Sequence, residues 1–200
     1  MKMNKNLIIK EKLIFTKDIN TNKNREWNPF HSKIAAGIRK GLIPNINQDS
    51  KILYLGAAEG YTVSFISDLI ENGIVYGIDI SPYSMQKLVL LSEDRKNIIP
   101  ILEDCNLVNE YKAFIETKVD LIIQDIAQKN QIEILKKNAN LFLKKKGEII
   151  LSLKLSAISQ KNINIIDREL KDLETDFRII KKVRLEPFEK KHVLVFAQKK

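Results

Sequence analysis

The sequence predicts an α/β protein with a Rossmann-like, mostly parallel seven-stranded sheet that ends in a C-terminal antiparallel hairpin. Short apolar runs alternate with helical patterns from residue 51 onward, as is typical of a parallel sheet covered by helices. A glycine-containing turn at residues 56–60 follows the first apolar run. The length of 200 residues suits one such core and is too short for two full-sized domains.

Three strands are predicted in the first half of this region. They are apolar runs of the buried type at residues 51–55, 74–78 and 98–102. A helix follows the first run. Ser81 and Pro82 predict the start of a second helix, because serine caps free backbone amides and the fixed φ of proline suits the first helical position. This second helix is expected to end near Arg95.

The remaining elements follow the same alternation. We expect helices at residues 107–116, 128–142 and 164–173, and strands at residues 119–123, 148–153, 177–183 and 192–197, the last two as the antiparallel hairpin. Lysines at 144–146 followed by Gly147 predict the end of the helix at 128–142. Cations are favourable near a helix C-terminus, and glycine readily takes the left-handed conformation of a cap.

The N-terminal region is organised differently, and we divide the chain into a short β appendage at residues 1–25 and a main domain at residues 26–200. The expected units are a hairpin or edge pair, a polar loop and a helix, at residues 7–17, 18–25 and from Asn28-Pro29 onward. The helical spacing places Phe30, Ile34 and Ile38 on one apolar face.

The composition points to a polyanionic partner. A formal net charge of +9 favours nucleic acid through long-range steering and counterion release, although lysines that are merely solvated remain the alternative. No apolar run reaches the roughly 20 residues of a membrane-spanning helix, and no signal peptide is recognisable. The single cysteine, Cys105, cannot form an internal disulfide, so a cytoplasmic protein is expected. We expect no metal site.

The turn at residues 56–60 predicts a nucleotide-like cofactor. Its glycines allow the backbone to approach a bound cofactor closely. Asp79, after the next strand, can accept hydrogen bonds from both ribose hydroxyls of that cofactor. The spacing Gly56-x-x-x-Gly60 differs from the G-x-G-x-x-G of pyrophosphate-binding turns, and this favours S-adenosylmethionine over a dinucleotide. A glycine-rich turn without any ligand is the structural alternative.

Aspartates follow the third and fourth strands as well. The carboxylate of Asp104 could accept a hydrogen bond from an adenine amino group while the backbone of Cys105 contacts the adenine ring. Asp104 could also cap the segment that begins at Asn106, and both roles can coexist. Asp125 is placed by the same argument in the crevice at the strand ends.

Four reactive polar residues are the strongest catalytic candidates: Lys33, Asp125, Lys154 and His192. Three of them fall at or near predicted strand ends, where parallel sheets place their chemistry. Lys154 closes an apolar strand, and a lysine there is costly unless it reaches a cleft. A solvated lysine at 33 and an ordinary polar residue at 192 are the alternatives for those two positions.

The chain resembles the fibrillarin family of RNA 2′-O-methyltransferases, in particular its archaeal members, from residue 25 to the C-terminus. The motifs that carry the resemblance are Trp27-Asn28-Pro29-x-x-Ser32-Lys33, Leu53-Tyr54-Leu55-Gly56, Thr62-Val63-Ser64, Ser67-Asp68, Asn97-Ile98-Ile99-Pro100-Ile101, Asp125-x-Ala127-Gln128 and Leu185-Glu186-Pro187-Phe188-Glu189-Lys190-x-His192. The resemblance implies the class I S-adenosylmethionine-dependent methyltransferase fold.

The activity implied by this resemblance is methylation of ribose 2′-hydroxyls in ribosomal RNA and also transfer RNA. The implied setting is a box C/D ribonucleoprotein particle, in which a guide RNA selects the target. A coiled-coil scaffold protein of the Nop family would bind the enzyme, and a kink-turn-binding protein would be an indirect partner.

The resemblance also implies roles for individual residues. The positions that match the S-adenosylmethionine site are Gly56, Ala58, Gly60, Tyr61, Thr62, Asp79, Ile80, Asp104, Cys105, Asp125, Ile126, Ala127 and Gln128. The four candidates named above match the catalytic tetrad. Our hypothesis is that Lys154, with a pKa lowered by burial and by Lys33, takes the proton of the 2′-hydroxyl. Asp125 would orient the lysine amine, and His192 would complete the hydrogen-bond network.

The chain departs from the family pattern at several positions. Glu59 replaces a small residue, Tyr61 a common threonine, and Lys129 a common proline, and archaeal members begin with a larger β-rich domain than residues 1–25. Two other functions remain open: a stand-alone RNA methyltransferase that needs no guide, and a catalytically idle RNA-binding scaffold.

Overall fold

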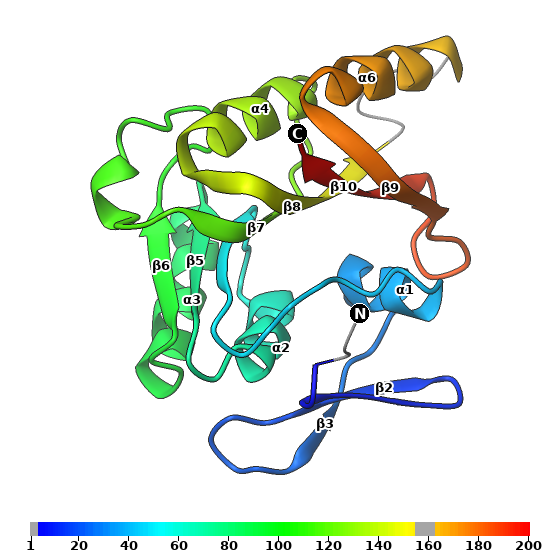
Figure 1. The fold of residues 1–200 in the computed structure, drawn as a ribbon. Helices are drawn as coiled ribbons and strands as arrows, with labels where there is room; N and C mark the ends of the chain where they lie inside the picture. The colour runs from blue at the N-terminus through cyan, green and yellow to red at the C-terminus, as the bar shows by residue number, and fades with distance from the viewer. Residues whose placement is uncertain (1–3, 155–162) are drawn as a thin grey trace.

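The protein is built around one seven-stranded sheet, seen in a computed structural model that describes residues 4–154 and 163–200. The strand order is β6-β5-β4-β7-β8-β10-β9, and Figure 1 shows the sheet between two groups of helices. The strands are β4 (Lys51–Leu55), β5 (Ile74–Asp79), β6 (Ile98–Leu102), β7 (Val119–Gln124), β8 (Leu143–Lys154), β9 (Phe177–Arg184) and β10 (His192–Lys199).

The pairing of these strands confirms the predicted fold class. Strands β6, β5, β4, β7 and β8 are mutually parallel, and β10 is antiparallel to both β8 and β9. The apolar runs at 51–55 and 98–102 become strands with the predicted bounds. Such continuous apolar runs are typical of parallel strands, because both of their faces are buried.

Helices cover both faces of the sheet. The helices are α1 (Lys33–Arg39), α2 (Tyr61–Leu69), α3 (Pro82–Asp94), α4 (Gln131–Phe142) and α6 (Ile163–Asp176), with a short 3₁₀ helix η1 (Lys112–Phe114). Alternate residues of β4 point to opposite faces, so Tyr54 packs with α1 to α3 and Leu53 packs with α4 and α6. Every helix among the described residues is too short or too polar to cross a bilayer.

The predicted start of α3 is confirmed. The Ser81 hydroxyl accepts a hydrogen bond from the Ser84 amide at 3.3 Å, and Pro82 occupies the first helical position. Ser32 caps α1 in the same way, with its hydroxyl 3.3 Å from the Ala35 amide. This cap fixes where the α1 helix begins.

The predicted helix at residues 107–116 is wrong. The segment consists of turns and η1. Asp104 Oδ1 accepts from both the backbone and the side-chain nitrogen of Asn106, at 2.8 and 2.9 Å, which favours a turn. The Tyr111 hydroxyl then donates to the buried Asn138 side chain at 2.6 Å. Tertiary contacts therefore override the helical pattern.

The helix predicted at residues 128–142 ends where expected, but the lysines and glycine at residues 144–147 do not cap it. Helix α4 ends at Phe142, and the lysines belong to β8, where Leu143 already pairs with Val119. The ladder shifts register just after this pair. The left-handed φ of 60° falls on Lys146 and not on Gly147. A strand irregularity has taken the place of the helix cap that the sequence suggested.

The N-terminal residues form a separate small sheet of β1 (Leu7–Lys10), β2 (Leu13–Lys17) and β3 (Asn24–Glu26). The predicted hairpin is confirmed by the antiparallel β1–β2 pair. The predicted polar loop is shorter than expected, because its last residues pair with β2.

The helix predicted from Asn28 begins only at Lys33. Asn28 Oδ1 accepts from the Phe30 amide at 2.9 Å and forms a turn instead. Phe30 is 61% exposed, so its predicted place on the apolar face is wrong, whereas Ile34 and Ile38 are buried as expected. Trp27 is fully buried and stacks on Phe65, with ring centroids 5.2 Å apart.

A buried ionic network fixes the small sheet to the main one. The Arg95 guanidinium lies 2.6 Å from Asp18 and 2.6 Å from Asp68, and Arg25 lies 2.9 Å from Asp68. Thr16 adds a hydrogen bond of 2.6 Å to Asp68. Because these groups come from the N-terminal segment, α2 and the end of α3, the two sheets are held together by charged groups as well as by apolar contact.

Candidate functional site

The predicted cofactor residues meet at one edge of the sheet. They follow the carboxyl ends of β4, β5, β6 and β7, which emerge together because these strands are parallel. Adjacent loops are bonded to one another. Gly56 and Ala57 donate to the Ile78 carbonyl, each at 2.9 Å, and Asp125 donates to the Leu55 carbonyl at 2.9 Å.

The glycine turn allows close approach of neighbouring loops. Gly56 has φ +83°, and a Cβ atom there would lie 2.4 Å from the Asp125 carbonyl oxygen. Gly60 has φ +89°, and a Cβ atom there would lie 2.7 Å from the Leu88 side chain of α3. The glycines therefore serve the packing of the turn itself, and Ala58 between them is exposed.

The Asp79 carboxylate is held in a fixed position at the end of β5. Its Oδ2 atom accepts from the Ala58 amide at 2.8 Å, and its Oδ1 atom accepts from the Ser81 amide at 2.9 Å. An ionised carboxylate has lone pairs left after these two bonds and can accept from hydroxyl groups as well. Ile80 beside it is 61% exposed and offers apolar surface.

Asp104 and Cys105 complete this part of the edge. The Asp104 carboxylate accepts a hydrogen bond from the Asn106 amide and caps the turn there, which is the second role predicted for it from the sequence. Burial raises the pKa of the Cys105 thiol to about 12, and the charges of Asp104 and Asp79 act in the same direction against a hydrogen bond from Gly56. The thiol is therefore protonated at neutral pH and unreactive.

The loop after β7 closes the edge on its other side. Gln128 Oε1 accepts from the Asn106 side chain at 3.0 Å and joins this loop to the one after β6. The Ile126 side chain comes close to Gly56, and Ala127 is exposed. The arrangement provides backbone groups, a fixed carboxylate and apolar surface, which fit an adenosine-like group such as that of S-adenosylmethionine.

Lys33 and Asp125 form an ion pair beside this edge. Lys33 Nζ lies 2.9 Å from Asp125 Oδ2, and the two side chains are 25% and 23% exposed. The pair lines a cavity of about 100 Å³ that Thr62 and Glu189 also line. Thr62 donates to the hydroxyl of the α1 cap Ser32 at 3.1 Å, so the cap that starts α1 also positions the first residue of that helix, Lys33.

His192 and Lys154 lie opposite each other in the sheet. They are paired residues of the antiparallel β10–β8 ladder. His192 Nδ1 lies 2.9 Å from the Lys190 carbonyl and 3.3 Å from Glu189 Oε1, so it reaches the cavity through Glu189. The side chain of Lys154 lies outside the described part of the structure, and its lowered pKa stays a prediction.

Two residues near the ion pair were not predicted from the sequence. Glu189 lines the cavity between Lys33 and His192. Tyr54 is buried in β4, and burial together with the Asp125 charge raises the pKa of its hydroxyl, against a hydrogen bond with Thr62. A hydroxyl among the aliphatic residues Ile52, Leu53 and Leu55 was the available signal for Tyr54.

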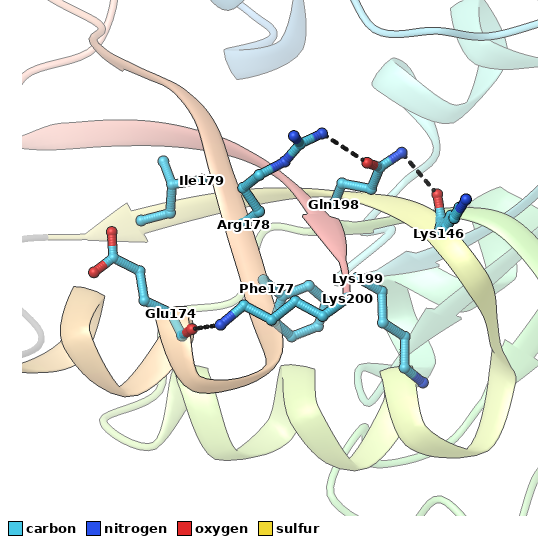
Figure 2. Close-up of a pocket in the computed structure, with 8 residues that line it drawn as sticks. All are labelled: Lys146, Glu174, Phe177, Arg178, Ile179, Gln198, Lys199 and Lys200. Carbon is cyan, nitrogen blue, oxygen red and sulfur yellow. Dashed lines mark hydrogen bonds between the residues drawn. The ribbon is translucent and has the colours of Figure 1, made fainter.

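A larger hollow of about 640 Å³ lies at the opposite edge of the sheet, near the end of β10. Figure 2 shows that its polar groups bind one another: Arg178 donates to Gln198 at 3.0 Å, and Lys200 donates to the Glu174 carbonyl at 2.6 Å. Lys199 donates to the Ala139 carbonyl at the end of α4. These cations cap helices and bind neighbours, and no predicted site residue whose side chain the structure describes lines the hollow.

Comparison with known proteins gives one consistent family. A family model described as Fibrillarin matches residues 2–200. A fibrillarin-like rRNA/tRNA 2′-O-methyltransferase of Archaeoglobus fulgidus is 45% identical over 175 residues, which are 86% of this chain and 83% of that protein.

Two solved structures extend the likeness to three dimensions. The structure of a fibrillarin/Nop5p complex matches with a TM-score of 0.92 and 40% identity, over 100% of this chain and 99% of the other. Aeropyrum pernix fibrillarin with natively bound S-adenosyl-L-methionine matches with a TM-score of 0.85 and 32% identity, over 92% and 88% of the two chains.

Proposed function

The chain belongs to the fibrillarin family, and from this premise we propose that it methylates ribose 2′-hydroxyls of ribosomal and transfer RNA with S-adenosylmethionine, directed by a box C/D guide RNA. The observation that carries the proposal is the Lys33–Asp125 pair, 2.9 Å apart. The pair stands at a cavity of about 100 Å³, next to the sheet edge that suits the adenosine group.

S-adenosylmethionine supplies an activated methyl group to the site. We propose that Asp79 binds the ribose hydroxyls of the cofactor and that Ile80 with the Asp104–Cys105 backbone contacts the adenine. The turn at Gly56, Ala58 and Gly60, the Tyr61–Thr62 start of α2, and residues 125–128 would hold the remainder. The fixed Asp79 carboxylate and the exposed Ile80 support this assignment.

A ribose 2′-hydroxyl is a poor nucleophile, so the protein must position it and remove its proton. The Lys33 ammonium has three donor hydrogens, of which Asp125 takes one. We propose that another one binds the substrate oxygen. Asp125 thereby orients the amine of Lys33, where our hypothesis from the sequence had it orient Lys154.

Lys154 is proposed as the group that takes the proton. Its backbone lies beside His192 in the β8–β10 ladder, which supports a place for both residues in one network. His192 Nδ1 is already engaged by the Lys190 carbonyl. In a neutral imidazole whose Nδ1 donates this bond, Nε2 is an acceptor, and it can bind a lysine amine or a water molecule.

The partners follow from the same proposal. A Nop-family scaffold protein is supported by the likeness to fibrillarin in its complex with Nop5p. Guide RNA, target RNA and, indirectly, a kink-turn-binding protein complete the proposed particle. The net charge of +9 supports a partner rich in phosphate.

Methyl transfer from labelled S-adenosylmethionine to target RNA tests the proposal against its two rivals. The assay compares the protein alone with the protein plus guide RNA and the other particle proteins. Transfer only in the complete mixture supports the guided enzyme. Equal transfer by the protein alone identifies a stand-alone methyltransferase, and cofactor binding without transfer identifies an idle scaffold.

A further inference from the structure

The ring of Phe30 stands at the mouth of the cavity that Lys33 and Asp125 line. Its side chain is 61% exposed, although phenylalanine is among the residue types most often buried. Phe30 is nevertheless a lining residue of the cavity, together with His31 and Glu189. Because the exposed ring lies at a cavity that a charged pair also lines, it can contact a ligand of that cavity.

Two separate parts of the chain hold this ring in place. Asn28 Oδ1 accepts from the Phe30 amide at 2.9 Å and fixes the turn before α1. From the loop between β9 and β10, Phe188 meets the ring edge to face, with centroids 5.1 Å apart and an angle of 71°. The Lys40 ammonium lies 6.0 Å from the centroid of the Phe188 ring. A ring held in this way loses little freedom when a ligand binds.

The size of the cavity limits what can enter it. Its volume of about 100 Å³ is far below the roughly 300–1,000 Å³ of sites that enclose a small molecule. Enzymes that extrude a base from a helix provide a pocket for the whole base, and this cavity is too small for one. The cavity that the described residues line holds only part of a nucleotide, which places the rest of the RNA across the exposed rim.

We propose that Phe30 contacts the target RNA, packing against the sugar next to the methylated ribose and so fixing the 2′-hydroxyl at Lys33 and Asp125. The inference rests on the proposed function. The minor groove of an RNA helix is wide and shallow and displays sugar edges and 2′-hydroxyls. The exposed Phe30 ring beside a polar cavity offers such a surface one apolar contact next to groups that can bind a hydroxyl.

Phe30→Ala tests this contact against a matched control, Phe114→Ala. Phe114 lies in η1, is 60% exposed and does not line the cavity. In the assembled particle we expect Phe30→Ala to raise the KM for target RNA and its dissociation constant about tenfold, at the lower end of the loss measured for an aromatic ring stacked on a base. The kcat should fall as well, because the 2′-hydroxyl is then positioned less well, whereas the affinity for S-adenosylmethionine should stay at the wild-type level. Phe30→Tyr should restore the KM, and Phe114→Ala should match the wild type.

Three results would overturn the proposal. An unchanged KM and RNA affinity in Phe30→Ala would remove the ring from the RNA surface. A loss of cofactor affinity would place Phe30 in the cofactor site, and weaker binding of the scaffold protein with unchanged RNA affinity would place it in a protein interface. If the wild-type particle transfers no methyl group, the proposed function fails, while the RNA affinities still decide the role of Phe30.

Discussion

Lys33 and Asp125, 92 residues apart in the chain, are joined by a hydrogen bond of 2.9 Å between Nζ and Oδ2. One residue opens α1, and the other follows β7 at the carboxyl edge of the sheet. A charge-assisted bond of this kind is short and directional. It fixes the lysine amine at the cavity in which we place the reacting hydroxyl.

Lys33→Met should separate catalysis from cofactor binding. The substitution keeps much of the aliphatic stem and removes the ammonium that would hold the 2′-hydroxyl. We expect methyl transfer to fall by roughly 10²-fold or more, the size of a lost positioned acid–base group, with unchanged affinity for S-adenosylmethionine by calorimetry. A parallel loss of both quantities would assign Lys33 to the cofactor site. Lys12→Met, on an exposed lysine in the turn between β1 and β2, controls for the loss of charge.

Asp79→Asn should have the opposite pattern. The variant keeps one acceptor for the Ala58 or Ser81 amide but loses the charge that accepts from two ribose hydroxyls. We expect cofactor affinity to fall roughly tenfold, with kcat at saturating cofactor largely retained, because one charged hydrogen bond contributes about 1.5–3 kcal/mol. Titration of the variant by calorimetry, beside Glu93→Ala as an exposed control, measures this. Wild-type affinity in Asp79→Asn would remove the residue from the site.

Arg95→Met should destabilise the fold. The guanidinium is buried between Asp18 and Asp68, 2.6 Å from each. Removing it leaves buried carboxylates with fewer partners, and breaking such a pair costs about 3–5 kcal/mol. Urea unfolding measures the change in the free energy of unfolding, and the exposed neighbour Lys96 supplies the control Lys96→Met, which should change it by less than about 0.5 kcal/mol. Equal stabilities of the two variants would show that the network is not stabilising.

The Asp18 carboxylate should make stability depend on acid pH. Burial alone would raise its pKa, but hydrogen bonds from Thr21 and the charge of Arg95 outweigh burial and lower the pKa from its usual 3.8. A group with a lowered folded pKa stabilises the protein above its unfolded pKa and loses this contribution as pH falls through the folded value.

Unfolding of wild type and Asp18→Asn between about pH 6 and pH 2 tests this dependence. The difference in free energy of unfolding should be constant above about pH 5 and shrink below it, since protons then remove the charge in both states. A difference that stays constant over the whole range would contradict the assignment.

The sequence predicted best those elements whose burial is evident from their own residues, because these are mostly apolar. Strand Ile98–Leu102 is apolar throughout because both faces of a parallel strand are covered. Residues 107–116 and 144–147 were predicted wrongly, since partners distant in sequence decide their structure: Asn138 for Tyr111, and Val119 for Leu143. The spacing of apolar residues within a segment does not show which distant residues will contact it.

The residues of the candidate site also fall into those that the sequence could place and those that it could not. Asp79 and Asp125 could be placed at one edge of the sheet because parallel strands end together. Nothing local to Lys33 places α1 against β7, and the resemblance alone joined Lys33 to Asp125 before the structure did. Phe30 was assigned to the core by helical spacing, whereas the turn at Asn28 delays the start of that helix to Lys33 and leaves the ring at the rim of the cavity.

The chemical position of the transferred methyl group tests the account most directly. The assembled particle is given labelled S-adenosylmethionine and either an all-ribose target RNA or the same RNA with one 2′-deoxyribose at the target nucleotide. We predict that label enters the all-ribose RNA and that the single deoxy substitution abolishes transfer. Equal labelling of both RNAs would show that the acceptor is not the 2′-hydroxyl, and labelling of neither, with cofactor bound, would show that the protein is not the methyltransferase.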